Sequence, residues 1–291
     1  VVELLLVMVV LGYFTLLERK ILGYGQFRKG PNKGVIWGLF QPLLDGVKLF
    51  MKGYWGMGVG GLIGLWGFPV LGLSVTLVLW VWLAVLWGVN SMGVVLFYMV
   101  LFGGFVGTCF FVAGYFTGGK YSQLGSVRSL AQVVTYEGVL VLGLLTVALW
   151  SVSGEEVLKP LLASGLVVVA VLLVSVVMES NRTPVDYVEG ESELVSGLVT
   201  EMGGLSFSLL FLMEYGVMSF YAVLISFLLW GMGLNVVWQV VSVLGVVLGM
   251  CVLRLALPRS RYDLSMGWGW KVGLIIVFLC YLTGLVGMLP E

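Results

Sequence analysis

The stretch "GLSFSLLFLMEYGVMSFYAVLISFL", residues 204–228, carries a single charged residue, Glu214, in an otherwise apolar run. A helix of about 20 apolar residues crosses the hydrocarbon core of a bilayer, so this stretch predicts a transmembrane helix. Seven other runs have the same character, and together they predict eight spans near residues 3–25, 61–88, 92–116, 126–149, 157–178, 204–228, 232–255 and 268–289. We therefore expect an all-α, polytopic membrane protein that forms a single integral membrane domain over residues 1–291.

The composition supports a membrane protein and excludes several kinds of site. Hydrophobic residues make up 60% of the chain and charged residues 10%, which leaves too little polar surface for a soluble domain. The chain has no His, and its three Cys, Cys109, Cys251 and Cys280, lie far apart. We therefore expect no haem, iron–sulfur cluster or other metal site in this chain. Nucleotide-binding glycine loops are missing too, and nucleic acid is not an expected partner.

The basic residues predict the topology. Of the 15 Lys and Arg residues, only Lys159 falls in a connection on the opposite side from the rest. The positive-inside rule then places both termini outside. The inside-facing connections are expected near residues 26–60, 117–127, 179–203 and 256–267.

A short amphipathic helix is predicted near residues 40–52, in "FQPLLDGVKLFMK". Its apolar and charged positions fall on different sides at helical spacing: Phe40, Leu43, Leu44, Val47 and Phe50 against Asp45, Lys48 and Lys52. Such a helix lies in the membrane interface and does not span it. It could be a basic membrane anchor, or a floor on which a soluble partner or a lipid-soluble ligand docks.

Two carboxylates, Glu137 and Glu214, fall inside predicted spans. An ionisable group at that depth costs at least a few kcal/mol, which favours a functional role. The alternative is a neutral Glu that makes a hydrogen bond between packed helices.

A third acidic feature is the connection "ESNRTPVDYVEGESELVSGLVTE", residues 179–201, in which Arg182 is the only base. Carboxylates this close together cannot all ionise cheaply, so we expect some of them to have raised, coupled pKa values. A solvated acidic loop is the simpler interpretation, but acid continues into the bilayer at Glu137 and Glu214. The residues alone thus favour a proton or cation pathway that enters from the inside face.

Several long motifs carry a resemblance to a known family. They are "LERKILGY", "RKGPN", "QPLLDGVKLF", "KYSQLGSVRSLAQVVTYE", "ESNRTPVDYVEGESELVSG" and "PRSRYD", in order between Glu18 and Lys271. The chain resembles the subunit 1 family of NADH:ubiquinone oxidoreductase, respiratory complex I, in its mitochondrial form. Where members of that family commonly have Ala, Phe and Tyr, this chain has Met178, Val185 and Met202.

The resemblance implies an eight-span subunit that forms a ubiquinone access chamber with soluble partner subunits. It implies that ubiquinone is the substrate, that the iron–sulfur clusters and FMN belong to partner subunits, and that membrane lipid surrounds the chain. The implied location is the mitochondrial inner membrane, with charged loops in the matrix and both termini on the intermembrane-space side. The chain would then act in an enzyme without a redox centre of its own.

The resemblance also implies roles for individual residues. The start of an acidic track that couples quinone reduction to proton translocation is assigned to Glu137, Glu179, Asp186, Glu189, Glu191, Glu193, Glu201 and Glu214. The quinone chamber and its entrance are assigned to Arg19, Gln26, Phe27, Arg28 and Arg182, of which Arg182 could pair with Asp186. Docking of partner subunits is assigned to Lys29, Gly30, Pro31, Asn32, Arg128, Arg259, Arg261 and Asp263.

Three alternatives stay open at this point. One is the homologous membrane subunit of a hydrogenase-type complex that uses no quinone, and a second is a standalone proton-coupled carrier. Carriers often contain internal repeats with broken helices, and none is visible in this sequence. The third is a purely structural anchor, which would leave Glu137 and Glu214 unexplained.

Overall fold

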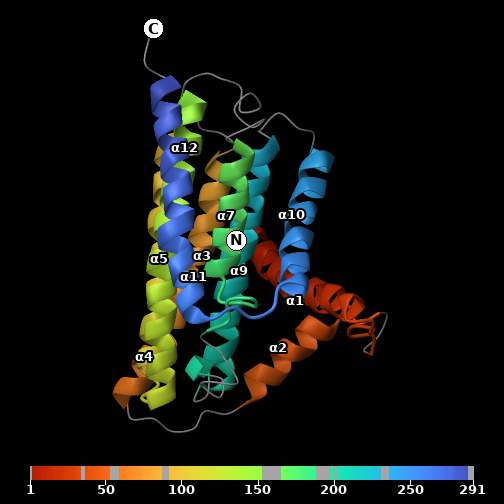
Figure 1. Ribbon diagram of the computed structural model, residues 1–291. Coiled ribbons are helices and arrows are strands. Elements are labelled where there is room, and N and C mark those ends of the chain that lie inside the picture. Colours follow the sequence, from red (N-terminus) through yellow and green to blue (C-terminus); the bar gives the residue numbers. More distant parts are fainter. Residues whose placement is uncertain are drawn as a thin grey trace.

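The computed structural model describes residues 2–33, 37–52, 59–86, 92–152, 165–187, 197–199, 202–230 and 236–287. All regular elements within these ranges are helical, and they form the bundle shown in Figure 1. The predicted all-α class is therefore confirmed.

The described helices occur in the following order along the chain. They are α1 (Val2–Gly25), α2 (Gln41–Met51), α3 (Val59–Leu86), α4 (Met92–Tyr115), α5 (Lys120–Val152), α7 (Leu166–Glu179), the 3-10 turn η2 (Gly197–Val199), α9 (Gly204–Trp230), α10 (Val236–Ala256), α11 (Tyr262–Trp268), the π-helical η3 (Gly269–Gly273) and α12 (Leu274–Gly287).

Six helices of the described chain are long and apolar enough to cross a membrane. They are α3, α4, α5, α9, α10 and the continuous helix α11–η3–α12. The other two predicted spans, 3–25 and 157–178, correspond to α1 and α7. Helix α1 carries Glu18, Arg19 and Lys20 in its second half, and α7 has 14 residues. Residues 157–164 of the predicted span lie outside the described residues. The prediction of eight spans is consistent with this arrangement.

Two helices begin earlier than predicted. Helix α5 starts at Lys120 and the last helix starts at Tyr262, so much of the predicted connections 117–127 and 256–267 is helical. The reason is that hydropathy marks only the apolar part of a helix, whereas the backbone hydrogen bonds continue into its polar end. Helix α3 continues through Pro69 as one helix.

Helix α2 confirms the predicted amphipathic segment. It has 11 residues and none of them is buried, and in Figure 1 it lies apart from the main bundle beside the lower end of α9. Its apolar side chains Leu43, Leu44, Val47 and Phe50 are all more than half exposed. Helix α2 therefore leaves an uncovered apolar side in this chain.

Helix α9 occupies the centre of the fold. It packs against α3 on one side, α1 and α10 on another, and α7 and the end of α2 as well. The largest apolar core lies among α3, α4, α5, α7 and α9 and includes Leu79, Met99, Leu144, Leu172 and Phe220. A residue in the first half of α9, such as Glu214, is thus placed where several helices meet.

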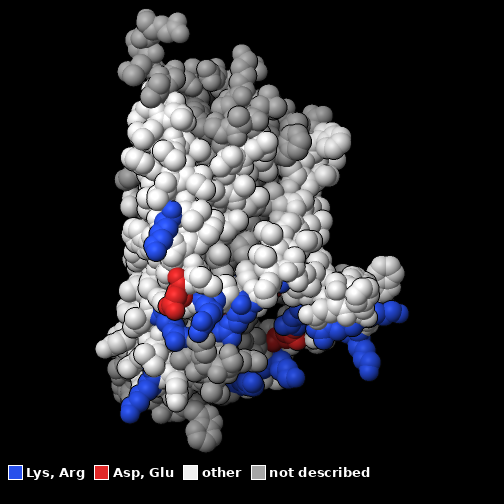
Figure 2. All heavy atoms as spheres, viewed as in Figure 1, with Lys and Arg blue, Asp and Glu red and all other residues white. Residues whose placement is uncertain are grey.

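The charged residues gather toward one end of the bundle. On the face shown in Figure 2, most of the Lys and Arg side chains lie in the lower half, near the ends of α1 and α2 in Figure 1. Above these side chains the described atoms of this face are white, except for an isolated basic side chain at about mid-height on the left. This distribution agrees with the predicted gathering of basic residues on one side of the membrane. That this side is the inside stays a prediction.

Candidate functional site

Three helix carboxylates come together inside the bundle. Glu179, the last residue of α7, is buried, and both Glu179 and Glu214 of α9 line one cavity of about 40 Å³. Glu137 of α5 lies against Gly104 of α4, where an added Cβ would overlap its carboxylate. Glu137 is also close enough to Glu179 for the two to interact electrostatically. The structure therefore places Glu137 and Glu214, the two carboxylates predicted inside spans, near Glu179, the first acid of the connection 179–201.

The walls of this cavity are mostly apolar. Side chains from α4, α5, α7 and α9 line it, and its polar members are Glu179, Ser180, Asn181, Glu214 and Tyr221. One water needs roughly 10–15 Å³ of such space, so the cavity has room for a few waters. The arrangement is a small, mostly apolar cavity with a few polar groups in its wall, and the two acids among them could bind and release protons.

The chain leaves α7 through a residue suited to a helix end. Asn181 has a φ of 51°, the left-handed conformation that Asn adopts more readily than most residues and that commonly ends helices. The amide of Ser180 still donates to the carbonyl of Val176, and its hydroxyl donates to Val177. This turn directs the next residue, Arg182, toward α9.

Arg182 forms a nearly buried ion pair with Glu214. The Nη2–Oε2 distance is 2.8 Å, and the two side chains are 12% and 11% exposed. The Arg182 guanidinium also lies 4.5 Å from the ring centre of Phe211 and 5.0 Å from that of Tyr215. The sequence suggested Asp186 as a partner of Arg182, and the pairing with Glu214 on a distant helix was not predicted.

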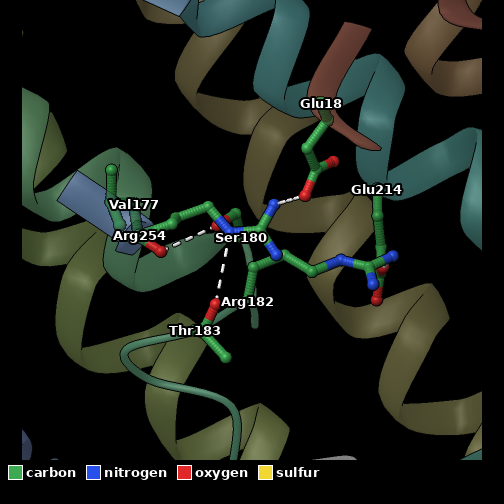
Figure 3. A network of polar contacts seen from close by, with 7 residues as sticks. All are labelled: Glu18, Val177, Ser180, Arg182, Thr183, Glu214 and Arg254. Atoms are coloured by element: carbon green, nitrogen blue, oxygen red, sulfur yellow. Dashed lines mark hydrogen bonds and ion pairs between the residues drawn. The ribbon is translucent and has the colours of Figure 1, made fainter. Parts of the chain in front are cut away.

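A second buried ion pair joins α1 to α10. Arg254 pairs with Glu18, and the side chains are 8% and 5% exposed. The Arg254 Nε also donates to the hydroxyl of Thr183 at 3.4 Å. Figure 3 shows that both ion pairs flank the turn at residues 180–183. Sequence reasoning missed this pair, although a Glu inside an apolar run and an Arg at the end of another were visible signals.

The segment after this turn is held against the connection between α10 and α11. The Tyr187 hydroxyl is 2.7 Å from the Ser260 hydroxyl and donates to the Arg261 carbonyl at 2.9 Å. The amide of Ser260 donates to the carbonyl of Pro184 at 3.0 Å, and Arg259 donates to the carbonyl of Asp186 at 2.8 Å. The predicted coupling residue Asp186 and docking residue Arg259 are therefore neighbours.

The remaining residues assigned to partner docking, Arg128, Arg261 and Asp263, lie in or near α11. The Arg128 guanidinium lies 5.9 Å from the ring centre of Tyr262, and Tyr262 packs edge to face against Tyr187. Asp263 lies in the first turn of α11, directly after Arg261 and Tyr262. Helix α11 is attached to α5 by the Tyr136 hydroxyl of α5, which donates to the Ser265 carbonyl at 2.7 Å.

The residues assigned to the quinone entrance lie at the end of α1. Arg19 forms an exposed ion pair of 2.8 Å with Asp45 of α2, and Gln41 donates to the same carboxylate at 2.9 Å. The chain then turns at Gln26, Phe27 and Arg28, with Phe27 at a φ of 55° and fully exposed. These contacts orient α2 relative to α1.

A second cavity, of about 220 Å³, lies beside this turn. Its lining residues come from the end of α1 and the following segment: Lys20, Tyr24, Lys29, Gly30, Pro31, Asn32 and Trp37. It contains four of the residues assigned to partner docking, namely Lys29, Gly30, Pro31 and Asn32. The structure thus places the residues of the "RKGPN" motif that were assigned to docking next to those assigned to the entrance.

Four of the assigned acids, Glu189, Glu191, Glu193 and Glu201, lie outside the described residues, as does Lys159. Among the described residues, His, Cys, Asp and Glu form no group of three that could hold a metal ion. Cys109 and Cys251 are buried free thiols, and Cys280 is a partly exposed one.

The chain has clear relatives. A family model described as NADH dehydrogenase matches residues 1–284. NADH-ubiquinone oxidoreductase chain 1 of Heterololigo bleekeri is 39% identical over 293 residues, covering 93% of this chain and 90% of the relative. The proteins of the same name from Patiria pectinifera and Aedes aegypti are each 35% identical. These two matches cover 98% and 97% of this chain, and 93% and 92% of the respective relatives.

Proposed function

Because this chain belongs to the NADH dehydrogenase family, we propose that it is the membrane subunit 1 of a proton-translocating NADH:ubiquinone oxidoreductase. The observation that carries the proposal is the match over almost the whole chain to relatives that bear the name NADH-ubiquinone oxidoreductase chain 1. The chain works in this enzyme by binding and by proton chemistry, while FMN and the iron–sulfur clusters of partner subunits carry the electrons.

The first part of the function is a chamber for ubiquinone. A quinone with a long apolar tail needs an apolar surface at the membrane interface with polar groups near its headgroup. Helix α2 offers exposed Leu43, Leu44, Val47 and Phe50, and the Arg19–Asp45 pair lies between α2 and α1. We assign α2 and the end of α1 to the part of the chamber that this chain contributes, with soluble partners closing it.

The second part is the start of a proton-coupling path. Glu179 and Glu214 line the cavity in the bundle, and Glu137 lies against α4 within electrostatic reach of Glu179. Arg182 connects the turn after α7 to Glu214. A change of one pKa unit corresponds to about 1.4 kcal/mol. Small movements of Arg182 relative to these acids are therefore sufficient to shift protons between them.

The two parts meet in the segment 182–187. Quinone reduction changes the charge in the chamber, and the segment 182–187 shifts in response. Arg182 belongs to the ion pair with Glu214 of α9, and Thr183 accepts a hydrogen bond from Arg254 of α10 (Figure 3). A rearrangement of this segment is therefore transmitted to α9 and α10. Proton affinities of Glu179, Glu214 and then Glu137 change as a result.

The relatives also bear on location and rival functions. Respiratory enzymes of this kind in animals lie in the mitochondrial inner membrane, so we assign the charged loops to the matrix and both termini to the intermembrane space. Membrane lipid and the other subunits of the complex are the partners.

A quinone-independent hydrogenase-type subunit and a standalone carrier both fit less well. The reason is that the relatives matched over more than nine-tenths of this chain bear the name NADH-ubiquinone oxidoreductase chain 1.

The assembly is tested by native electrophoresis of mildly solubilised membranes, with this chain located by mass spectrometry. We expect it in a megadalton-scale band that reduces quinone with NADH and is sensitive to a quinone-site inhibitor. Migration as a small species without NADH activity, despite intact extraction of other complexes, would contradict the proposal.

The coupling role is tested in the acidic loop. Glu191→Gln and Glu193→Gln are expected to impair NADH:ubiquinone reduction while the complex still assembles, because each removes a titrating group and keeps the side-chain volume. NADH oxidation by an artificial acceptor that bypasses the quinone site is the control and should not change. Wild-type quinone turnover in both variants would remove these two residues from the path.

A further inference from the structure

Tyr221 places a hydroxyl at the cavity that holds Glu179. It lies on α9, its side chain is buried, and it lines the cavity together with Glu179 and Asn181. An added Cβ on Gly103 of α4 would lie 2.5 Å from the Tyr221 hydroxyl oxygen. Gly103 therefore leaves room for this hydroxyl.

The neighbouring glycine leaves room for a carboxylate. An added Cβ on Gly104 would overlap the carboxylate of Glu137. Two consecutive glycines of α4 thus face the hydroxyl of Tyr221 and the carboxylate of Glu137. Tyr221 also lies close enough to both Glu137 and Glu179 for electrostatic interaction with each.

Two acceptor atoms near the cavity have no hydrogen-bond partner within the described chain. They are the Oε2 atom of Glu179 and the Oδ1 atom of Asn181, and both residues are more than nine-tenths buried. Buried polar atoms in proteins are nearly always satisfied by the protein or by ordered water. Both residues line a cavity with room for a few waters, so water is the donor that fits.

We propose that the Tyr221 hydroxyl and water in this cavity form a proton relay between Glu179 and Glu137. The inference rests on the proposed function, because it names the groups that carry the proton within the same acidic path. Protonated Glu179 gives its proton to a cavity water. The water passes a proton to the Tyr221 oxygen while the original hydroxyl proton moves to the Glu137 carboxylate. Glu179 ends ionised, Glu137 ends neutral, and Tyr221 regains its starting form when its hydroxyl rotates.

If Tyr221 served only to pack its ring, loss of its hydroxyl would have no effect. Tyr221 packs edge to face against Phe220, with ring centres 5.5 Å apart, and a Phe at position 221 would keep this contact. The hydroxyl oxygen is the Tyr221 atom that lies nearest to Gly103. The substitution Tyr221→Phe therefore separates the packing of the ring from the chemistry of the hydroxyl.

The experiment compares four variants in membranes that contain the whole complex: Tyr221→Phe, Glu179→Gln, Glu137→Gln and the control Tyr98→Phe. Tyr98 is a partly exposed residue of α4 that stacks on Trp82. The readouts are assembly on native gels, the NADH:ubiquinone rate, protons translocated per NADH, and the change of the rate in D₂O. We expect Tyr221→Phe to assemble and to lower the coupled rate roughly tenfold, as for the loss of one hydrogen-bonding group from a proton-transfer path. We also expect its rate to fall further in D₂O than that of the wild type or Tyr98→Phe.

The outcomes separate the relay from the wider proposal. Wild-type rates and isotope effects in Tyr221→Phe, with both Glu variants impaired, would overturn the relay and leave the acidic path intact. Wild-type behaviour of all three variants would overturn both. If Tyr221→Phe does not assemble, a map of the native complex that resolves waters decides the question. Water within hydrogen-bonding distance of Glu179 Oε2 and the Tyr221 hydroxyl supports the relay, and a dry cavity refutes it.

Discussion

Two arginine–carboxylate pairs of this chain have the same length and different surroundings. Arg182–Glu214 and Arg19–Asp45 each measure 2.8 Å between nitrogen and oxygen. The first is 12% and 11% exposed and lies between the turn after α7 and helix α9, whereas the second is 57% and 35% exposed and lies between α1 and α2. The same contact distance therefore occurs in the interior of the bundle and at its surface.

The environment decides what each pair does. Charges at an exposed site keep most of their hydration, so a surface pair stabilises a protein by about 0–1 kcal/mol. A buried charge has lost that hydration, and removing its partner leaves it uncompensated. The interior pair thus makes the position of the loop after α7 depend on the charge of α9, while the surface pair orients α2 with little energetic consequence.

The largest effect is expected from Arg182→Met. It leaves Glu214 buried without its cation, which typically costs about 3–5 kcal/mol in a protein interior. We expect little assembled complex on native gels and a lower thermal stability of what remains.

The double variant Arg182→Met/Glu214→Leu is the matched control for that prediction. Because it removes both charges, we expect assembly to recover toward the wild-type level. Quinone-coupled proton translocation should stay impaired, since the path has lost an acid. Equal instability of the single and double variants would show that the charge pair is not what the fold depends on.

An intermediate effect is expected from Gly104→Ala. The added methyl group overlaps the carboxylate at the end of the flexible Glu137 side chain, which must move away. Overpacking of an interior typically costs about 1–3 kcal/mol, and we expect a loss at the lower end of that range. Gly138→Ala on α5 is the control, because nothing lies within 4 Å of a Cβ built there. Melting temperatures of the purified complex compare the two variants, and equal melting temperatures would mean that Glu137 moves away from α4 without cost.

The smallest effect on stability is expected from Asp45→Asn. It removes the charge of the exposed pair, and the expected loss is below about 1 kcal/mol. The melting temperature and assembly should therefore match the wild type. Any change in catalysis should appear as a higher KM for ubiquinone at an unchanged NADH oxidation rate with an artificial acceptor. A loss of assembly as large as that of Arg182→Met would erase the distinction between the two pairs.

The helices were largely predictable because their signal is local. An apolar run of sufficient length predicts a span regardless of which helices pack against it. The helical spacing of apolar and charged residues in 40–52 predicts α2 in the same way. The early starts of α5 and α11 were not predictable from hydropathy, because Lys120 and Tyr262 belong to polar helix ends.

The pairing of charges was not predictable for a different reason. Whether Glu18 meets Arg254 depends on which sides of α1 and α10 face each other, and no local pattern contains that information. Tyr221 was missed because a single Tyr in an apolar helix is an ordinary residue of a membrane protein. Its interest arises only from the glycines of another helix that leave room for its hydroxyl.

The π-helical stretch Gly269–Gly273 determines how α11 faces the rest of the bundle. A π turn accommodates one residue more than an α turn, and each residue of an α-helix corresponds to about 100° of rotation and 1.5 Å of rise. Deleting one residue here would restore regular α-helix and turn Tyr262 away from Tyr187, against which it now packs. Within this helix a change in chain length is therefore also a change in the angle at which α11 presents its side chains.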